Sequence, residues 1–323
     1  MTHKVKLLPS GHEFVLEGSE TLFDAAMRAG VNLNYSCSSG NCGLCKARLL
    51  SGRVEQIRSQ DFVLSAAEKA GGYLLVCTQT ARSDVVLEAP EAHSTHELPF
   101  QEIAARVKSL SHLSQDVALL RVQTPRTSTL RFMAGQRAGL TVQGIHGERP
   151  IASCPCDGRN LQFILRQNPH DPLARLLFAN ARAGQPITVS GPRGDFVLRE
   201  DSKAPLLFVA FDDGFAPISS LLTHAVSMDQ APRFHLCWVA SRAGGHYLES
   251  LCRSWRDALD NFTYLQLVAA DATEVLARID AYCRDLGSYD VYLAGPEHIL
   301  GAIADGLRDK GAQSDRLRTE IVD

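Results

Sequence analysis

Four cysteines in this chain have the spacing of an iron–sulfur ligand set: Cys37, Cys42, Cys45 and Cys77. The first three follow the pattern C-x4-C-x2-C, and 31 residues separate the third from the fourth. Plant-type [2Fe–2S] clusters are held by four thiolates with this spacing. The cysteines therefore predict a metal centre that accepts and releases one electron at a time.

The loop that carries the first three cysteines is rich in small residues. Three thiolates must converge on one inorganic core, so the backbone has to turn tightly, and Gly40 and Gly43 can adopt positive φ at little steric cost. Backbone N–H groups of such a loop can point at the sulfurs and tune the cluster. We expect the fourth thiolate on a strand over residues 73–77.

A structural zinc site and unrelated buried cysteines are the alternative interpretations. Zinc sites usually present two close pairs of cysteine or histidine, whereas only Cys42 and Cys45 form such a pair here. Disulfides are not expected, because the chain shows no sign of an oxidising compartment. The other five cysteines have no ligand spacing, and most are expected to be small core residues: Cys154, Cys156, Cys237, Cys252 and Cys283.

The composition favours a soluble, cytoplasmic protein of two or three domains. The chain has 323 residues and a net charge of −3, so nothing indicates binding to nucleic acid. Its longest apolar runs, such as residues 205–211, are far too short to span a bilayer. Residues 1–4 begin a strand-like alternation, which is not the pattern of a signal peptide.

The order of elements predicts three units and a linker. Residues 1–90 mix strands with short helices, as in a small α+β domain, and the polar residues 91–99 are predicted to be the linker. Residues 100–203 hold short strands that are predicted to close into an antiparallel β-barrel. Residues 204–323 alternate strand and helix, as in a doubly wound parallel α/β domain. The fold class is therefore multidomain, α+β and α/β.

Capping and periodicity signals predict the helices. Ser65 and Glu68 have the form of a capping box, and Gly30 is expected to end a helix. Besides the short helix after Ser65, helices are expected over residues 21–29, 173–180, 216–226, 247–259, 274–286 and 298–310.

Short motifs outside the cysteine loop are those of one known family. Residues 191–196 read Gly-Pro-Arg-Gly-Asp-Phe, residues 214–220 begin Gly-Phe-Ala-Pro, and Gly295 precedes Pro296. With these motifs and the cysteine loop, the whole chain resembles the iron–sulfur flavoprotein reductases that serve bacterial ring-hydroxylating dioxygenases and multicomponent monooxygenases. Those reductases belong to the ferredoxin–NADP reductase superfamily.

The resemblance implies a β-grasp ferredoxin domain and a route for electrons. In that family a hydride passes from NAD(P)H to FAD, and single electrons then pass to the [2Fe–2S] cluster and on to an oxygenase. It implies a redox partner such as an oxygenase or a larger enzyme complex. No residue is assigned a catalytic role, and the positions that correspond to flavin or nicotinamide contacts are Arg149, Ser153, Gly191, Gly194, Gly214, Pro217 and Gly295.

Both cofactor motifs depart from the family pattern. The flavin motif R-P-Y-S-I-A-S is Arg-Pro-Ile-Ala-Ser at residues 149–153, as if the Tyr-Ser pair that contacts the flavin ring were deleted. The nucleotide motif G-G-x-G-x-A-P begins Phe-Asp-Asp at residues 211–213, with carboxylates where a diphosphate would sit. Residues 169–174 replace the family's FAD-phosphate segment, Ala294 replaces a cysteine near the nicotinamide, and the C-terminal aromatic is missing.

Three hypotheses follow. The leading one is a [2Fe–2S] electron-transfer protein that relays single electrons to a partner redox protein, with its flavin and NAD(P)H sites lost. The alternative is a complete NAD(P)H:FAD:[2Fe–2S] reductase component of a multicomponent oxygenase, which would use Arg149, the 191–196 turn and a rearranged Gly214 turn. A purely structural subunit with a relict cluster is the third. On the leading hypothesis NAD(P)H is not a cofactor, FAD stays an open question, and the chain is an electron carrier or docking subunit.

Overall fold

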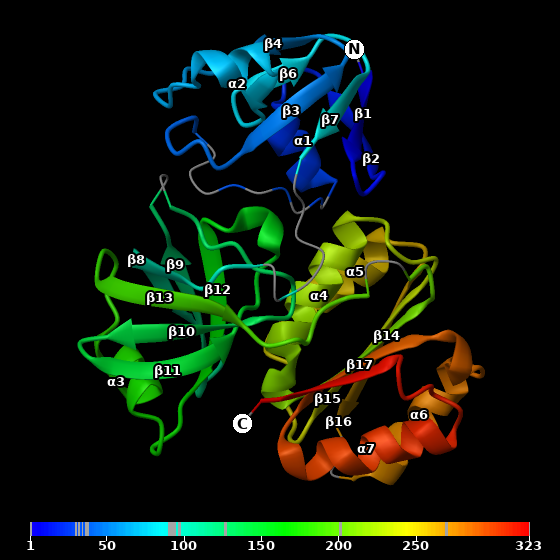
Figure 1. Ribbon diagram of the computed structural model, residues 1–323. Coiled ribbons are helices and arrows are strands. Elements are labelled where there is room, and N and C mark those ends of the chain that lie inside the picture. Colours follow the sequence, from blue (N-terminus) through cyan, green and yellow to red (C-terminus); the bar gives the residue numbers. More distant parts are fainter. Residues whose placement is uncertain are drawn as a thin grey trace.

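Three units follow one another along the chain, each built around its own sheet (Figure 1). The computed structural model describes residues 2–29, 31, 33, 35, 39–89, 95, 98–125, 128–199, 202–268 and 271–322. Gly30, Cys37 and most of the predicted linker over residues 91–99 lie outside the described residues. No helix in these ranges is both long and apolar enough to cross a membrane.

The N-terminal unit is a mixed sheet with a helix packed against it. Its strand order is β2-β1-β7-β3-β5, and β1 runs parallel to β7 while the other pairs are antiparallel. Helix α1 (Leu22–Arg28) begins at Thr21 in a capping box with Asp24, and α2 (Ala66–Ala70) confirms the capping box predicted at Ser65. The strands are β1 (Thr2–Leu8), β2 (Glu13–Glu17), β3 (Lys46–Ser51), β4 (Val54–Gln56), β5 (Tyr73–Leu75), β6 (Gln79–Ala81) and β7 (Val85–Glu88).

The middle unit is a six-stranded antiparallel half-barrel. Its strand order is β11-β10-β13-β8-β9-β12. The predicted antiparallel barrel is confirmed as a half-barrel, because in the described residues no ladder joins β11 to β12. β11 ends at Pro150, which has no N–H with which to extend a ladder. The elements are β8 (Gln101–His112), β9 (Val117–Gln123), β10 (Arg137–Val142), β11 (Ile145–Pro150), β12 (Asn160–Arg166), α3 (Pro172–Asn180) and β13 (Pro186–Arg193).

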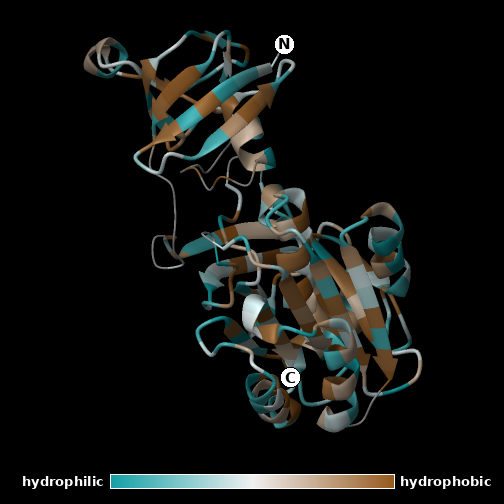
Figure 2. Ribbon diagram, turned by 90° about the vertical axis from the view of Figure 1, so that its right-hand side faces the viewer, coloured by the Kyte–Doolittle hydropathy of each residue, from teal (hydrophilic) through white to brown (hydrophobic). Residues whose placement is uncertain are grey.

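The C-terminal unit is a five-stranded parallel sheet in the order β16-β15-β14-β17-β18. β14 and β17 are buried along their whole length, as expected of strands covered on both faces, and Figure 2 shows hydrophobic residues gathered on the strands. The strand order reverses between β14 and β17, which is the topological switch point. The elements are β14 (Leu206–Phe211), α4 (Phe215–Ser227), β15 (Phe234–Ala240), α5 (Glu249–Ala258), β16 (Phe262–Val268), α6 (Ala272–Tyr282), β17 (Asp290–Gly295), α7 (Glu297–Asp309) and β18 (Leu317–Ile321).

Two predicted helices are shorter in the structure than in the prediction. The helix expected over 247–259 begins at Glu249, because the preceding Leu248 lies outside the helical region with φ −121° and ψ 30°. The helix expected over 274–286 ends at Tyr282, because the next residue, Cys283, leaves the helical region with φ −120° and ψ 84°. The prediction named no strand at β4, β6, β8, β11 or β18.

The half-barrel and the C-terminal unit share one hydrophobic cluster. Leu119 and Ile164 of the half-barrel belong to the same cluster as Phe215 and Leu221 of α4. α4 lies between the two sheets in Figure 1. The turn that leads from β14 into α4 is therefore close to the contact between these two units.

Candidate iron–sulfur and cofactor sites

Two of the predicted cluster ligands meet in the core of the N-terminal unit. Cys45 Sγ and Cys77 Sγ are 3.0 Å apart, and both residues are buried. Cys77 does not lie on a strand as predicted, because β5 ends at Leu75. The Thr78 N–H donates to the Leu75 carbonyl at 3.0 Å and closes a turn that places Cys77 beside Cys45.

The cysteine loop needs glycine at two positions. Gly40 and Gly43 adopt φ +81° and +75°, which confirms the prediction of positive φ. A Cβ at Gly40 would lie 2.9 Å from Gln60 Cα, and a Cβ at Gly43 would lie 2.5 Å from Phe62 Cζ. Side chains at either position would therefore push the loop away from the 60–62 segment. Sequence reasoning did not identify this segment as support for the loop.

Cys45 and Cys77 are buried side by side, and burial disfavours the charge of a free thiolate. Hydrogen bonding with Cys77 and burial both raise the pKa of Cys45, so the free thiol resists ionisation. Bound iron supplies the positive charge that a buried thiolate requires. Cys42 is partly exposed in the same loop. In the described residues no three metal-binding side chains come together, and Cys37 lies outside those residues.

Arg149, the predicted flavin-phosphate contact, is already paired with a carboxylate. It lies on β11, where its guanidinium donates to Asp171 and to the Glu148 carbonyl. Asp171 is also the N-cap of α3, accepting from the Ala174 N–H at 3.0 Å. A helix N-terminus and an arginine together form a phosphate site, and here Asp171 occupies both donors. FAD phosphates fit this place only if Asp171 releases Arg149.

Ser153 and the 191–196 turn are held within the scaffold. The Ser153 hydroxyl accepts from the Gln162 N–H at 3.2 Å, and its carbonyl accepts from Ser220 of α4 at 2.7 Å. Gly191 lies in β13, and the Gly194 carbonyl accepts from Gln136 Nε2 at 3.0 Å. These contacts join the half-barrel to its own turn and to α4. The resemblance places flavin contacts at these positions.

The predicted nucleotide turn packs directly against the end of β17. Gly214 ends a short 3-10 turn, Pro217 lies in the first turn of α4, and Gly295 ends β17. A Cβ at Gly214 would collide with the Ala294 carbonyl, and a Cβ at Gly295 would lie 2.5 Å from Phe211 Cβ. Phe211 is buried. The residues at the switch point therefore contact one another where the resemblance places the dinucleotide.

The two carboxylates of this turn have protein partners. Asp213 accepts two hydrogen bonds from Arg166 of β12, at 2.6 and 2.8 Å, and Arg166 also donates to Asp116 at 2.7 Å. Burial opposes the charge of Arg166, but Asp213 and Asp116 raise its pKa above the ordinary value. Asp212 accepts from the Ser241 N–H at 3.0 Å. As it stands, this turn does not fit a diphosphate, because carboxylates occupy it and Arg166 is committed to them.

Arg166 and the Cys154–Cys156 pair were missed by sequence reasoning. Arg166 joins the half-barrel to the nucleotide turn, and nothing at the end of its strand distinguished it from other basic residues.

Cys154 and Cys156 form a disulfide, so the expectation of no disulfide is wrong for this pair. The C-x-C spacing was the available signal. The other three cysteines outside the cluster loop are buried as expected: Cys237, Cys252 and Cys283.

Known proteins resemble this chain in sequence. Residues 5–82 match the family of 2Fe-2S iron-sulfur cluster binding domains. The chain is 28% identical to the CDP-6-deoxy-L-threo-D-glycero-4-hexulose-3-dehydrase reductase of Yersinia pestis, over 98% of this chain and 97% of the relative. It is 29% identical to the toluate 1,2-dioxygenase electron transfer component of Pseudomonas putida, over 97% and 96%. The reductase component of propane 2-monooxygenase from Rhodococcus jostii is 25% identical over 98% and 90%.

Solved structures share the fold over nearly the whole chain. The cytochrome P450 reductase of Amycolatopsis aligns with a TM-score of 0.63 at 22% identity, covering 99% of this chain and 98% of that one. The ferredoxin reductase in carbazole 1,9a-dioxygenase aligns with a TM-score of 0.61 at 21% identity and the same coverage. At these identities the likeness defines the fold.

Residues 5–82 thus match a 2Fe-2S iron-sulfur cluster binding domain, and along nearly its whole length the chain is similar to reductase and electron transfer components. The half-barrel and the C-terminal unit share the fold of reductases of known structure and are together called the reductase module.

Proposed function

We propose that this protein passes single electrons through a [2Fe–2S] cluster to a partner redox enzyme. The observation that carries the proposal is the glycine-supported loop that places Cys45 beside the buried Cys77, inside the residues that match a cluster-binding family. When bound by Cys37, Cys42, Cys45 and Cys77, such a cluster supplies one-electron redox chemistry. The relatives' names support an oxygenase or a sugar dehydrase as the kind of partner.

The side chains of the reductase module favour a chain without its own hydride step. Asp171 occupies the donors that would hold a flavin phosphate, and Asp213 occupies Arg166 beside the switch point. The Tyr-Ser pair of the flavin motif is absent from the sequence. Electrons would then come from an external donor, and the half-barrel and C-terminal unit would serve as a docking platform.

A complete NAD(P)H:FAD:[2Fe–2S] reductase is the second candidate, and the comparisons favour it over the first. The three relatives named above are a reductase, a reductase component and an electron transfer component, and each is matched over at least 90% of its length. Arg149, Ser153 and the 191–196 turn would hold FAD once Asp171 has moved. FAD, when bound, supplies the conversion of a two-electron hydride into single electrons.

Reduction of a one-electron acceptor tests the claim that both candidates share. The protein is reduced with dithionite, freed of excess reductant anaerobically, and mixed with an acceptor such as cytochrome c. We expect electron transfer that Cys42→Ser abolishes together with the cluster, while Cys283→Ser, in a buried core position, retains both. Transfer that continues at the same rate in Cys42→Ser would refute a role for the cluster.

A further inference from the structure

Cys154 and Cys156 differ sharply in exposure although one residue separates them. They flank Pro155 in the connection between β11 and β12, and they form a disulfide with their Cα atoms 5.3 Å apart. Cys154 is buried, with 7% of its surface exposed, whereas Cys156 is exposed. Exposed disulfides are the ones that exchange readily with external thiols, because a thiolate must reach a sulfur atom. Of this pair, Cys156 is the residue that is exposed to such attack.

The buried sulfur has two polar contacts that suit a leaving thiolate. The Cys156 N–H donates to Cys154 Sγ at 3.4 Å, and His224 Nδ1 of α4 lies 3.6 Å from the same sulfur. Desolvation lowers the pKa of His224 to about 4, so the imidazole is neutral at physiological pH and can hydrogen-bond to a thiol. The remaining cysteines outside the cluster loop are buried as free thiols. Burial raises the pKa values of Cys237 and Cys252 to about 12 and that of Cys283 to about 11.

We propose that Cys154 and Cys156 are a redox-active dithiol–disulfide pair that exchanges with small-molecule thiols and disulfides. In the reducing direction an external thiolate attacks the Cys156 sulfur, the Cys154–Cys156 bond breaks, and Cys154 leaves as a thiolate. A second external thiolate then attacks the external sulfur of the mixed disulfide and releases Cys156. Two external thiols become one disulfide, and the two protein sulfurs take up the two protons. The inference is independent of the proposed electron-transfer function.

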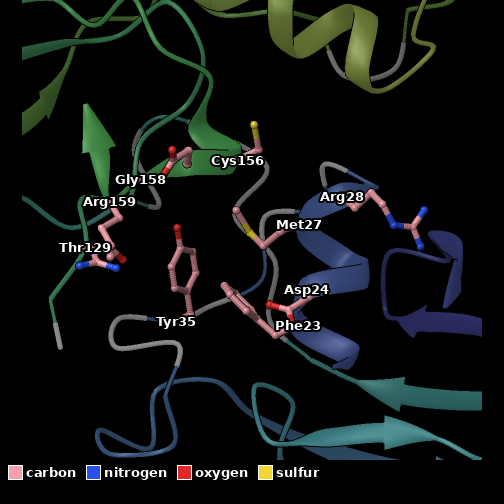
Figure 3. Close-up of a pocket in the computed structure, with 10 residues that line it drawn as sticks. Phe23, Asp24, Met27, Arg28, Tyr35, Thr129, Cys156, Gly158 and Arg159 are labelled. Carbon is pink, nitrogen blue, oxygen red and sulfur yellow. The ribbon is translucent and has the colours of Figure 1, made fainter. Parts of the chain in front are cut away.

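The pair lies beside the contact between the N-terminal unit and the half-barrel. A cavity of about 370 Å³ at this contact is lined by Phe23, Met27 and Tyr35 on one side and by Cys156 and Arg159 on the other. Figure 3 shows Cys156 at the rim of this cavity, with its sulfur pointing away from the Tyr35 ring. Cys156 as a residue is exposed at this place, whereas Cys154 is buried. A change in its redox state would occur at the junction of the two units.

Thiol trapping tests the redox exchange directly. The whole protein is equilibrated anaerobically in buffers of reduced and oxidised glutathione at different ratios, quenched with acid, alkylated and digested with trypsin. The peptide of residues 138–159 contains Cys154 and Cys156 and no other cysteine. We expect it to convert reversibly between an unalkylated disulfide and a doubly alkylated form as the ratio changes. A peptide that stays doubly alkylated in oxidised glutathione, or a disulfide that no thiol reduces, would overturn the proposal.

Two single variants test which sulfur is attacked. In Cys154→Ser the remaining Cys156 should form a mixed disulfide with glutathione roughly tenfold or more faster than Cys154 does in Cys156→Ser, because reaction follows exposure. Cys283→Ser is the matched control and should leave exchange at the pair unchanged, with iron content confirming that each variant retains its fold. Equal rates in the two variants, or a faster reaction at Cys154, would contradict the assignment of Cys156 as the attacked sulfur.

Discussion

Alanine at Gly43 should weaken the cluster loop much more than alanine at Gly18. Both glycines have positive φ, +75° and +63°, so in both cases an added Cβ carries the cost of the left-handed region, about 1–2 kcal/mol per residue. Nothing lies within 4 Å of a Cβ at Gly18. At Gly43 the Cβ would lie 2.5 Å from Phe62 Cζ, far inside van der Waals contact, so the ring or the loop must move.

The difference between the two variants isolates the cost of moving Phe62. Overpacking of a well-packed site typically costs about 1–3 kcal/mol. A difference of about 1–2 kcal/mol changes an equilibrium by a factor of about 5–30. We therefore expect Gly43→Ala to lose its cluster absorbance in the presence of an iron chelator about 5–30 times faster than Gly18→Ala, and to unfold at lower urea concentration.

A second substitution checks the cause. Phe62→Ala removes the ring that the Cβ would meet, so Gly43→Ala should cost less in the Phe62→Ala background than in the native chain. Phe62→Ala alone provides the reference for its own loss of packing. If Gly43→Ala holds its cluster as long as Gly18→Ala does, the reasoning about the loop is refuted.

Two further predictions concern the reductase module. Asp171→Asn retains an N-cap for α3 but removes the charge that occupies Arg149. FAD should therefore bind about 5–10 times more tightly, as expected from the loss of a competing ion pair of about 1 kcal/mol. Flavin fluorescence titration measures the affinity, and unchanged affinity would contradict a competing role for Asp171. Desolvation lowers the pKa of His224 from 6.5 to about 4. Between these two pH values the unfolded chain binds more protons than the folded chain. The free energy of unfolding therefore falls as the pH falls, by up to about 1.4 kcal/mol per pH unit. Urea unfolding at pH 7 and pH 5 should show a smaller pH effect in His224→Asn than in the native chain, and equal pH effects would count against a buried neutral imidazole.

Features set by local chemistry could be predicted from the sequence. The positive φ at Gly40 and Gly43, the capping box at Ser65 and the parallel sheet of the C-terminal unit follow from residue types and periodicity, and all three are present. The position of Cys77 was harder to predict, because the strand before it ends at Leu75, whose carbonyl accepts a hydrogen bond from the Thr78 N–H. Such a turn has no strong sequence signal here.

Contacts between distant segments could not be predicted in the same way. Arg166 reaches Asp213 across 47 positions of sequence, and Arg149 reaches Asp171 across 22. Which acid an arginine meets depends on how the half-barrel and the C-terminal unit pack, which no periodicity records. The Phe62 ring behind Gly43 is likewise a tertiary contact. These contacts decide whether the flavin and nucleotide positions are open.

One measurement tests the central claim most directly. Anaerobically purified protein is incubated with excess FAD and desalted, its iron and acid-released flavin are quantified, and the cluster absorbance is followed on adding NADH or NADPH and then dithionite. The account predicts two irons per chain, as a [2Fe–2S] cluster requires, with bleaching by dithionite. If Asp171 and Asp213 block the flavin and nucleotide positions, no flavin is retained and NAD(P)H does not bleach the cluster. One FAD per two irons, with bleaching by NAD(P)H, would instead establish the complete reductase. Iron-free protein, or a cluster that dithionite does not bleach, would contradict electron transfer itself.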